Sequence, residues 1–217
     1  VLNLESGKSR TVPTKKELFA NGENDQYFSW SPDGRWILFD YAVPGIAPGE
    51  VGLVAADGKS PAVNLTESGF NDGRARWVLD GKAMLWFSNR DGLNSVAQGG
   101  ASQSDAYAMF FTREAWDRFR LSKEDFALLK EEEEKKAKEK DKDKPKEGAD
   151  AAKDKEPKVE PLTIDLEDIA LRKARLTIHS STLGDALLSK DGETLYYLAR
   201  FERGLNLWTT SLRTRET

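Results

Sequence analysis

The sequence has 217 residues, of which 32% are charged and 38% belong to the apolar group, and its formal net charge is −4. This length allows one or two domains with a sizeable core, and the charge gives no basic surface for nucleic acid or anionic lipid. There is no cysteine, which excludes disulfides and thiolate chemistry, and no apolar run long enough to span a membrane as a helix. The chain begins at Val1 inside a strand-like run, so we expect it to be part of a longer protein.

A Pro-Asp-Gly turn lies between two short apolar runs in residues 30–39. Pro32 restricts φ, Asp33 can hydrogen-bond the local backbone, and Gly34 supplies the positive φ that closes the turn. The flanking runs are too short for helices and rich in aromatic and branched residues, so the pattern predicts a β-hairpin. The strands of this repeat are expected near residues 26–31, 35–41, 50–55 and 62–66.

The hairpin recurs at residues 76–87 and 187–197, with Leu79 and Lys190 in the position of the proline. We expect these replacements to leave the turn geometry unchanged. The strand after each Asp-Gly turn is a continuous apolar run, which is typical of a sheet covered on both faces. Four antiparallel strands in every 45–50 residues or so is the spacing of a β-propeller blade.

An insertion interrupts the second blade after its expected third strand at residues 104–112. The large apolar side chains of residues 113–120 favour a helix, and Ser122 with Asp125 three residues later can cap a second one. Residues 140–157 are expected to be mobile unless a partner holds them, because they cannot bury enough apolar surface to offset their ordering entropy. Three roles stay open for the insertion: an inert tether, a partner-docking arm anchored by its first helix, or a lid over the pore.

The blade pattern resumes after the insertion. Ordered chain is expected at residues 161–166 and 174–178, which supply the missing outer strand, and a third blade begins near Gly184. The predicted fold is therefore all-β, a propeller segment of four-stranded antiparallel blades, two complete and two partial. The predicted division is propeller at residues 1–112, insertion at 113–160 and propeller again at 161–217.

Few residues of the sequence are candidates for catalysis or for binding a metal or cofactor. His179 is the only histidine and has no indicated partner, so a surface position is the favoured interpretation. No nucleophile motif is present, and no catalytic residue is predicted. The turn aspartates Asp33, Asp80 and Asp191 lie one to a repeat without neighbouring carboxylates, so neither a metal site nor another cofactor is expected.

Two arginines are the candidate ligand contacts. Arg90 and Arg203 follow the second strand of their blades, in loops of the kind that line a propeller's mouth and carry binding. The alternative is that both are solvated loop charges. Five tryptophans occupy strand positions of the repeats and are expected to fill the core between blades rather than to bind a ligand. They are Trp30, Trp36, Trp77, Trp86 and Trp208.

The hallmark at residues 30–39 and its continuation at residues 87–92 resemble the propeller repeats of the translocation protein TolB and of tricorn-type proteases. Residues 112–119 with their Lys/Glu-rich tail, and residues 165–169 leading to 175–177, resemble the N-terminal propeller of bacterial tricorn-like serine peptidases. The resemblance covers the chain outside the insertion.

This resemblance implies a non-catalytic propeller segment that acts in peptide binding or access and as scaffold for a protease module outside this chain. The alternative is a TolB-like interaction propeller of the bacterial envelope without a protease module. The implied partners are a peptide or protein substrate, the remaining blades and protease region of the parent chain, and other copies in an oligomer. The compartment stays open, with the resemblance favouring periplasm over cytoplasm.

Overall fold

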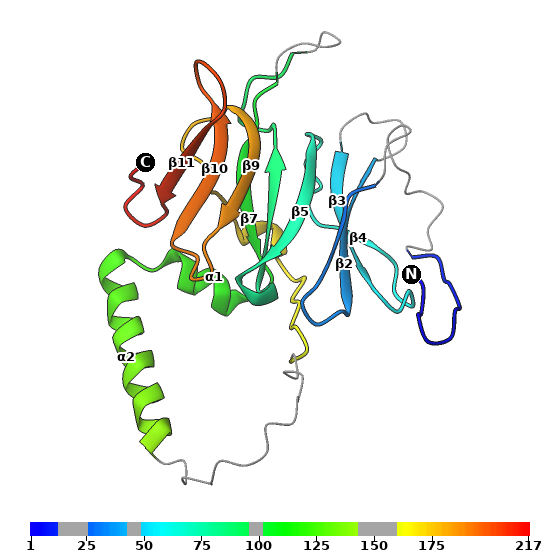
Figure 1. The fold of residues 1–217 in the computed structure, drawn as a ribbon, viewed down its shortest axis with the longest axis horizontal. Helices are drawn as coiled ribbons and strands as arrows, with labels where there is room; N and C mark the ends of the chain where they lie inside the picture. Colours follow the sequence, from blue (N-terminus) through cyan, green and yellow to red (C-terminus); the bar gives the residue numbers. More distant parts are fainter. Residues whose placement is uncertain (13–25, 43–48, 96–101, 143–159) are drawn as a thin grey trace.

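The structure is a computed structural model that describes residues 1–12, 26–42, 49–95, 102–142 and 160–217. It contains three antiparallel sheets that stand side by side (Figure 1). In each sheet the strands pair with their neighbours along the chain, which is the topology of a propeller blade. The all-β propeller fold expected from the repeats is thus confirmed, with two four-stranded sheets and one three-stranded sheet.

The strand bounds follow the predicted repeats closely. The first sheet has β1 (Phe28–Trp30), β2 (Trp36–Ala42), β3 (Gly49–Ala55) and β4 (Val63–Asn64). The second has β5 (Asp72–Val78), β6 (Ala83–Ser88), β7 (Asp105–Phe110) and β8 (Lys173–Arg175). The third has β9 (Thr182–Leu188), β10 (Thr194–Arg200) and β11 (Asn206–Ser211).

The cores lie between neighbouring sheets. Leu38, Val51 and Leu53 of the first sheet pack against Met84 and other residues of the second. The opposite face of the second sheet packs against the third in a separate cluster, which includes Leu85 and Leu195. Successive residues of one central strand therefore enter two different cores, which explains why these strands are continuously apolar.

A serine hydroxyl organises the first and third Asp-Gly turns. The Oγ of Ser31 accepts the N–H of Trp36 at 2.9 Å, and the Oγ of Ser189 accepts the N–H of Thr194 at 2.9 Å. The replacement of the turn proline by Lys190 therefore leaves this geometry intact.

The second turn is different, and the expectation that Leu79 leaves its geometry unchanged is wrong. Val78 stands where the other turns have serine, so no hydroxyl is available there. The chain instead forms a 3₁₀ turn, η1 (Leu79–Gly81), in which Leu79 and Asp80 both have φ of 54°. A leucine in this left-handed region is strained.

The insertion begins directly after β7. Helix α1 (Arg113–Arg120) starts at Thr112, whose hydroxyl accepts the N–H of Ala115 at 3.1 Å. Helix α2 (Lys123–Lys142) starts after Ser122, whose hydroxyl accepts the N–H of Asp125 at 3.0 Å, so both predicted helices are confirmed. Figure 1 shows α1 beneath the second and third sheets, whereas α2 extends away from them.

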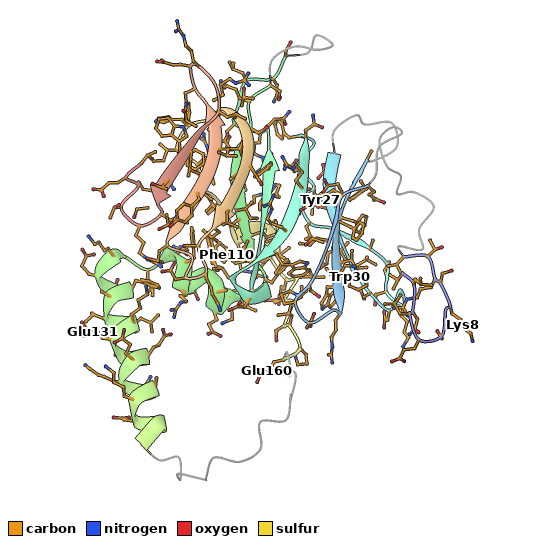
Figure 2. The ribbon with its side chains drawn as sticks, viewed as in Figure 1. Lys8, Tyr27, Trp30, Phe110, Glu131 and Glu160 are labelled. Atoms are coloured by element: carbon orange, nitrogen blue, oxygen red, sulfur yellow. The ribbon has the colours of Figure 1, made fainter. Side chains whose placement is uncertain are left out.

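Aromatic side chains fix α1 to the sheets. The ring of Phe110, labelled in Figure 2, lies 5.4 Å from that of Trp116 and 4.7 Å from that of Phe119, measured between centroids. Most of the segment predicted to be mobile, residues 143–157, lies outside the described residues. In the described part of the chain, no helix has the length and apolar character needed to cross a bilayer.

The return from the insertion differs from the predicted strand at residues 161–166. This segment forms no strand but lies across the first and second sheets. The Leu162 N–H donates to Asp33 Oδ2 at 2.8 Å, the Asp165 N–H donates to the Phe111 carbonyl at 2.9 Å, and Ile164 packs into the core between the sheets. The chain then passes through η2 (Ile169–Leu171) into β8, which occupies part of the predicted outer strand.

The first twelve residues form a short turn closed by an antiparallel bridge between Leu2 and Ser9. Arg10 donates to the carbonyl of Ala56, and Val12 packs against the outer face of the first sheet. This segment therefore lies on the sheet face that the second blade does not cover.

Candidate functional site

The two predicted ligand arginines lie in equivalent loops. Arg90 follows β6 and Arg203 follows β10, and both loops leave the same end of their sheets, at the top of Figure 1. The Asp-Gly turns and α1 lie at the opposite end, so the molecule has a loop end and a turn end. The loop-end site is defined as Phe70 and Arg90.

Arg90 is half-buried and its guanidinium carbon lies 5.7 Å from the centroid of the Phe70 ring. Its backbone N–H donates to Ser88 Oγ at 3.2 Å, but within the described residues no carboxylate forms an ion pair with its side chain. Phe70 is 37% exposed. An arginine that lies over an exposed aromatic ring and has no carboxylate partner among the described residues is suited to binding an anionic group beside an apolar one.

Lys173 adds a second positive charge. It lies at the start of β8, and burial together with the charge of Arg90 lowers the pKa of its ammonium group. The Asp72 carboxylate acts in the opposite direction. Neighbouring cations disfavour each other's charged form, which is the direction of the Arg90 effect on Lys173, although the Lys173 backbone lies opposite Met109 toward the turn end.

Buried polar contacts hold the loop after β6 in place. The indole N–H of Trp86 donates to Asp72 at 3.2 Å, and the Trp86 ring stacks on Tyr107 with centroids 5.3 Å apart. The Tyr107 hydroxyl donates to the carboxylate of Asp91, next to Arg90. Burial and this hydrogen bond raise the pKa of Tyr107, so it stays a donor across the physiological range.

Arg203 lies in a different setting. Arg203 is exposed, and its carbonyl accepts a long hydrogen bond of 3.5 Å from the Asn206 side chain. Within the described residues no contact joins it to Arg90. The structure therefore places the two arginines at the same end of the sheets without bringing them together in one site, and ligand binding by either stays a prediction.

Other candidates from the sequence have structural positions. His179 is exposed, as expected. Among the described residues no three acidic or histidine side chains are grouped so that they could hold a metal ion. Four of the five repeat tryptophans pack in the two cores between sheets, whereas Trp30 is 42% exposed and lines a 170 Å³ apolar cavity on the outer face of the first sheet.

Phe70 and Lys173 were not predicted from the sequence. Phe70 lies in the loop between the first and second sheets, where no repeat motif marks it. Lys173 follows the insertion, and the pairing of β8 with β7 places its backbone opposite Met109, toward the turn end of the second sheet.

No protein-family model matches this sequence, and no curated protein matches it. Solved structures, in contrast, do match it. Tricorn protease is 13% identical, with a TM-score of 0.55 over 99% of this chain and 19% of its own. TolB from Acinetobacter baumannii is 18% identical, with a TM-score of 0.49 over 99% of this chain and 35% of its own. A putative TolB from Agrobacterium tumefaciens is 10% identical, with a TM-score of 0.45 over 90% of this chain and 49% of its own.

This chain spans between about one fifth and one half of the length of these proteins. At such low identity the likeness concerns the fold. The match to tricorn protease, together with three neighbouring sheets of propeller topology, shows that the chain is a segment of a β-propeller.

Proposed function

We propose that this chain is a non-catalytic propeller segment of a tricorn-like peptidase, which binds peptides at its loop end and supports a protease module outside this chain. The observation that carries the proposal is the free guanidinium of Arg90 over the exposed ring of Phe70. A peptide offers the matching groups, carboxylates next to apolar side chains. The tricorn protease match supports the link to proteolysis through the shared fold.

An exposed face of the third sheet supports the inference that the parent propeller has a further blade. Leu38, Leu85 and Tyr196 stand four residues after the glycine of their turns, and the first two are fully buried between sheets. Tyr196 is 41% exposed, and its neighbours Leu187, Leu198 and Leu207 are 59%, 39% and 68% exposed. Because this face repeats the pattern that buries its counterparts, we infer that a further blade covers it in the parent protein.

The peptide-binding part is tested by fluorescence anisotropy with fluorescein-labelled ten-residue peptides that carry Asp and Leu. Arg90→Gln should weaken binding by at least about tenfold, because a charge-assisted contact contributes roughly 1.5–3 kcal/mol. Lys59→Gln is the matched control, since this exposed lysine lies in the turn after β3 and, among the described residues, forms an ion pair with exposed Asp57 alone. Equal affinities for wild type and Arg90→Gln would contradict the assignment of the site.

The peptidase part is tested on the longer gene product that contains this segment. The proposal expects casein cleavage by that protein and none by residues 1–217 alone. An uncleaved substrate with the longer protein, combined with capture of an envelope protein partner, would favour the TolB-like interaction propeller instead.

A further inference from the structure

A cavity of about 270 Å³ lies at the turn end, where the two helices of the insertion meet the second and third sheets. Its walls come from the turn η1, helix α1, the start of α2, the third Asp-Gly turn and the chain after β11. We call it the turn-end cavity. Its volume suits a small metabolite, because pockets for drug-sized molecules begin at about 300 Å³. Phe70 and Arg90 do not line it, so it is separate from the loop-end site.

The wall formed by η1 has a strained backbone. Leu79 and Asp80 both line the cavity, and both have φ of 54°. The side chain of Leu79 reaches the third turn, because a Cβ at Gly192 would lie 3.1 Å from its Cδ2 atom. Strained residues cluster at functional sites, where the surrounding structure holds them in place. The strained turn therefore closes one wall of the cavity, as expected of a binding site rather than of a chance gap between helices.

One carboxylate oxygen of the cavity wall lacks a donor. Glu193 accepts the Nε–H of Arg213 at 2.6 Å through its Oε2 atom. Its Oε1 atom is buried and has no hydrogen-bond partner among the described residues. The terminal nitrogens of Arg213 donate to carbonyls at the end of α1. A buried carboxylate oxygen without a donor is costly, so a ligand that brings an N–H group to Glu193 would relieve this cost.

Two lysines of the wall have no acidic partner. Arg118 donates to Glu133 through both terminal nitrogens, at 2.6 and 3.1 Å, so this ion pair is satisfied within the wall. Lys82 and Lys190 also line the cavity and are exposed, and within the described part of the chain neither forms an ion pair. Charge-assisted hydrogen bonds are the strong ones, so these two ammonium groups suit a carboxylate of the ligand.

Carboxylates dominate the rest of the wall. The hydrogen bond to Glu133 raises the pKa of the Arg118 guanidinium, and the charges of Glu193 and Glu114 act in the same direction, whereas burial opposes them. Asp80 is a further lining carboxylate, and no ion pair joins it to another described residue. A simple anion would meet this negative charge. A ligand with both a cationic and an anionic group matches the cavity better.

The apolar part of the wall is fixed by packing. The rings of Phe119 and Phe126 line the cavity together with Ala115. Phe126 is buried, and the Phe119 ring lies 4.7 Å from that of Phe110, measured between centroids. An aliphatic side chain can therefore bury apolar surface against rings that are already held in place.

We propose that the turn-end cavity binds a free α-amino acid with an apolar side chain. The ammonium group of the ligand donates to Glu193 Oε1, its carboxylate lies beside Lys82 and Lys190, and its side chain packs against Phe119 and Phe126. An α-amino acid carries these three groups on one carbon, which suits the small volume. Because the ligand contacts both helices of the insertion and the third turn, its binding holds α2 against the propeller. This inference does not rest on the proposed function.

Isothermal titration calorimetry of this chain with L-leucine tests the site without any variant. Leucine should bind with a dissociation constant between about 0.01 and 1 mM. Leucinamide lacks the carboxylate, 4-methylpentanoate lacks the ammonium group and glycine lacks the side chain, so each should bind at least about tenfold more weakly. The inference is overturned if leucine does not bind at about 10 mM. It is also overturned if any of the three analogues binds as tightly as leucine.

A variant and amide hydrogen exchange locate the binding. Lys190 is exposed and the Ser189 hydroxyl holds its turn, so Lys190→Gln should keep the wild-type melting temperature and bind leucine at least about fivefold more weakly. Lys59→Gln, the same substitution in the turn after β3, should bind like wild type. Leucine should slow exchange at the start of α2. Wild-type affinity in Lys190→Gln, or protection confined to segments outside the turn end, would overturn the inference.

Discussion

The guanidinium carbon of Arg213 lies 3.7 Å from the centroid of the Phe126 ring, which joins the chain after β11 to the first turn of α2. The same side chain donates to the carbonyls of Phe119 and Leu121 at the end of α1 and to Glu193 Oε2 at 2.6 Å. Among the α2 residues whose side chains are described, Phe126 alone is buried. A single arginine from the third blade therefore caps α1 and anchors α2.

Replacing Arg213 with alanine should loosen the insertion. The loss leaves Glu193 partly buried without its partner and removes hydrogen bonds from the α1 carbonyls, so the free energy of unfolding should fall by about 2–4 kcal/mol. Urea denaturation measures this change, and amide hydrogen exchange should quicken first in α1 and the start of α2. Arg120→Ala is the control because Arg120 is exposed on α1. Equal losses in the two variants would contradict the anchoring role.

The turn serines should be the stabilising part of the repeat motif. Ser31→Ala and Ser189→Ala each leave the N–H of a strand's first residue without its hydroxyl acceptor, which should cost about 1–2 kcal/mol of unfolding free energy. Ser6→Ala, in the exposed turn near the N-terminus, should change stability by less than about 0.5 kcal/mol. Thermal melts of the three variants provide the comparison. A null effect of both turn variants would show that the Asp-Gly backbone alone specifies the hairpins.

Stability should depend on pH through Asp40. Burial raises the pKa of this carboxyl from 3.8 to about 6, so the folded state holds its proton more tightly than the unfolded chain. The resulting stabilisation is fully present below about pH 3.8 and is lost as pH rises through about 6. The melting temperature of wild type should therefore fall between pH 5 and pH 7.5, and Asp40→Asn should make this fall smaller. The exposed Asp57→Asn should retain the wild-type fall, and a retained fall in Asp40→Asn would contradict this assignment.

Strand β5 carries a β-bulge between Gly73 and Arg76, and this bulge should not tolerate a side chain at Gly73. A Cβ there would lie 2.8 Å from Asp40 Oδ2, so Gly73→Ala should lower the unfolding free energy by about 1–3 kcal/mol. At Gly184 the nearest atoms to a Cβ are side-chain carbons at 3.5 Å, and Gly184→Ala should cost less. Chemical denaturation of both variants measures the two losses in unfolding free energy. If they lose equal stability, the fit of Asp40 against the bulge is not a specific constraint.

The hairpins were predictable because their cause is local. Pro32, Asp33 and Gly34 specify a turn by their own conformational preferences, and the apolar runs on either side specify the strands. The second turn could not be predicted in detail, because its departure follows from the absence of a hydroxyl at Val78 rather than from the motif itself. Residues 161–166 were expected to contribute to the outer strand, but Ile164 packs into the core between the first two sheets instead.

The candidate sites were only partly predictable. Arg90 was identified because its loop follows a repeat strand, but its partner Phe70 comes from the loop between the first two sheets. The register shift between Gly73 and Arg76 in β5 has no composition signal apart from Gly73. The Arg74 N–H there donates to Asp40 of the first sheet, and no local pattern encodes that contact.

The proposed function requires that peptides bind at the loop end. Photo-crosslinking with a benzophenone-bearing ten-residue peptide, followed by mass spectrometry of the labelled fragments, tests it directly. We expect adducts in the segments around Phe70 and Arg90. Labelling should fall strongly in Arg90→Gln and stay at the wild-type level in Lys59→Gln. Adducts confined to the Asp-Gly turn end or to α1 and α2, or equal labelling of Arg90→Gln, would contradict it.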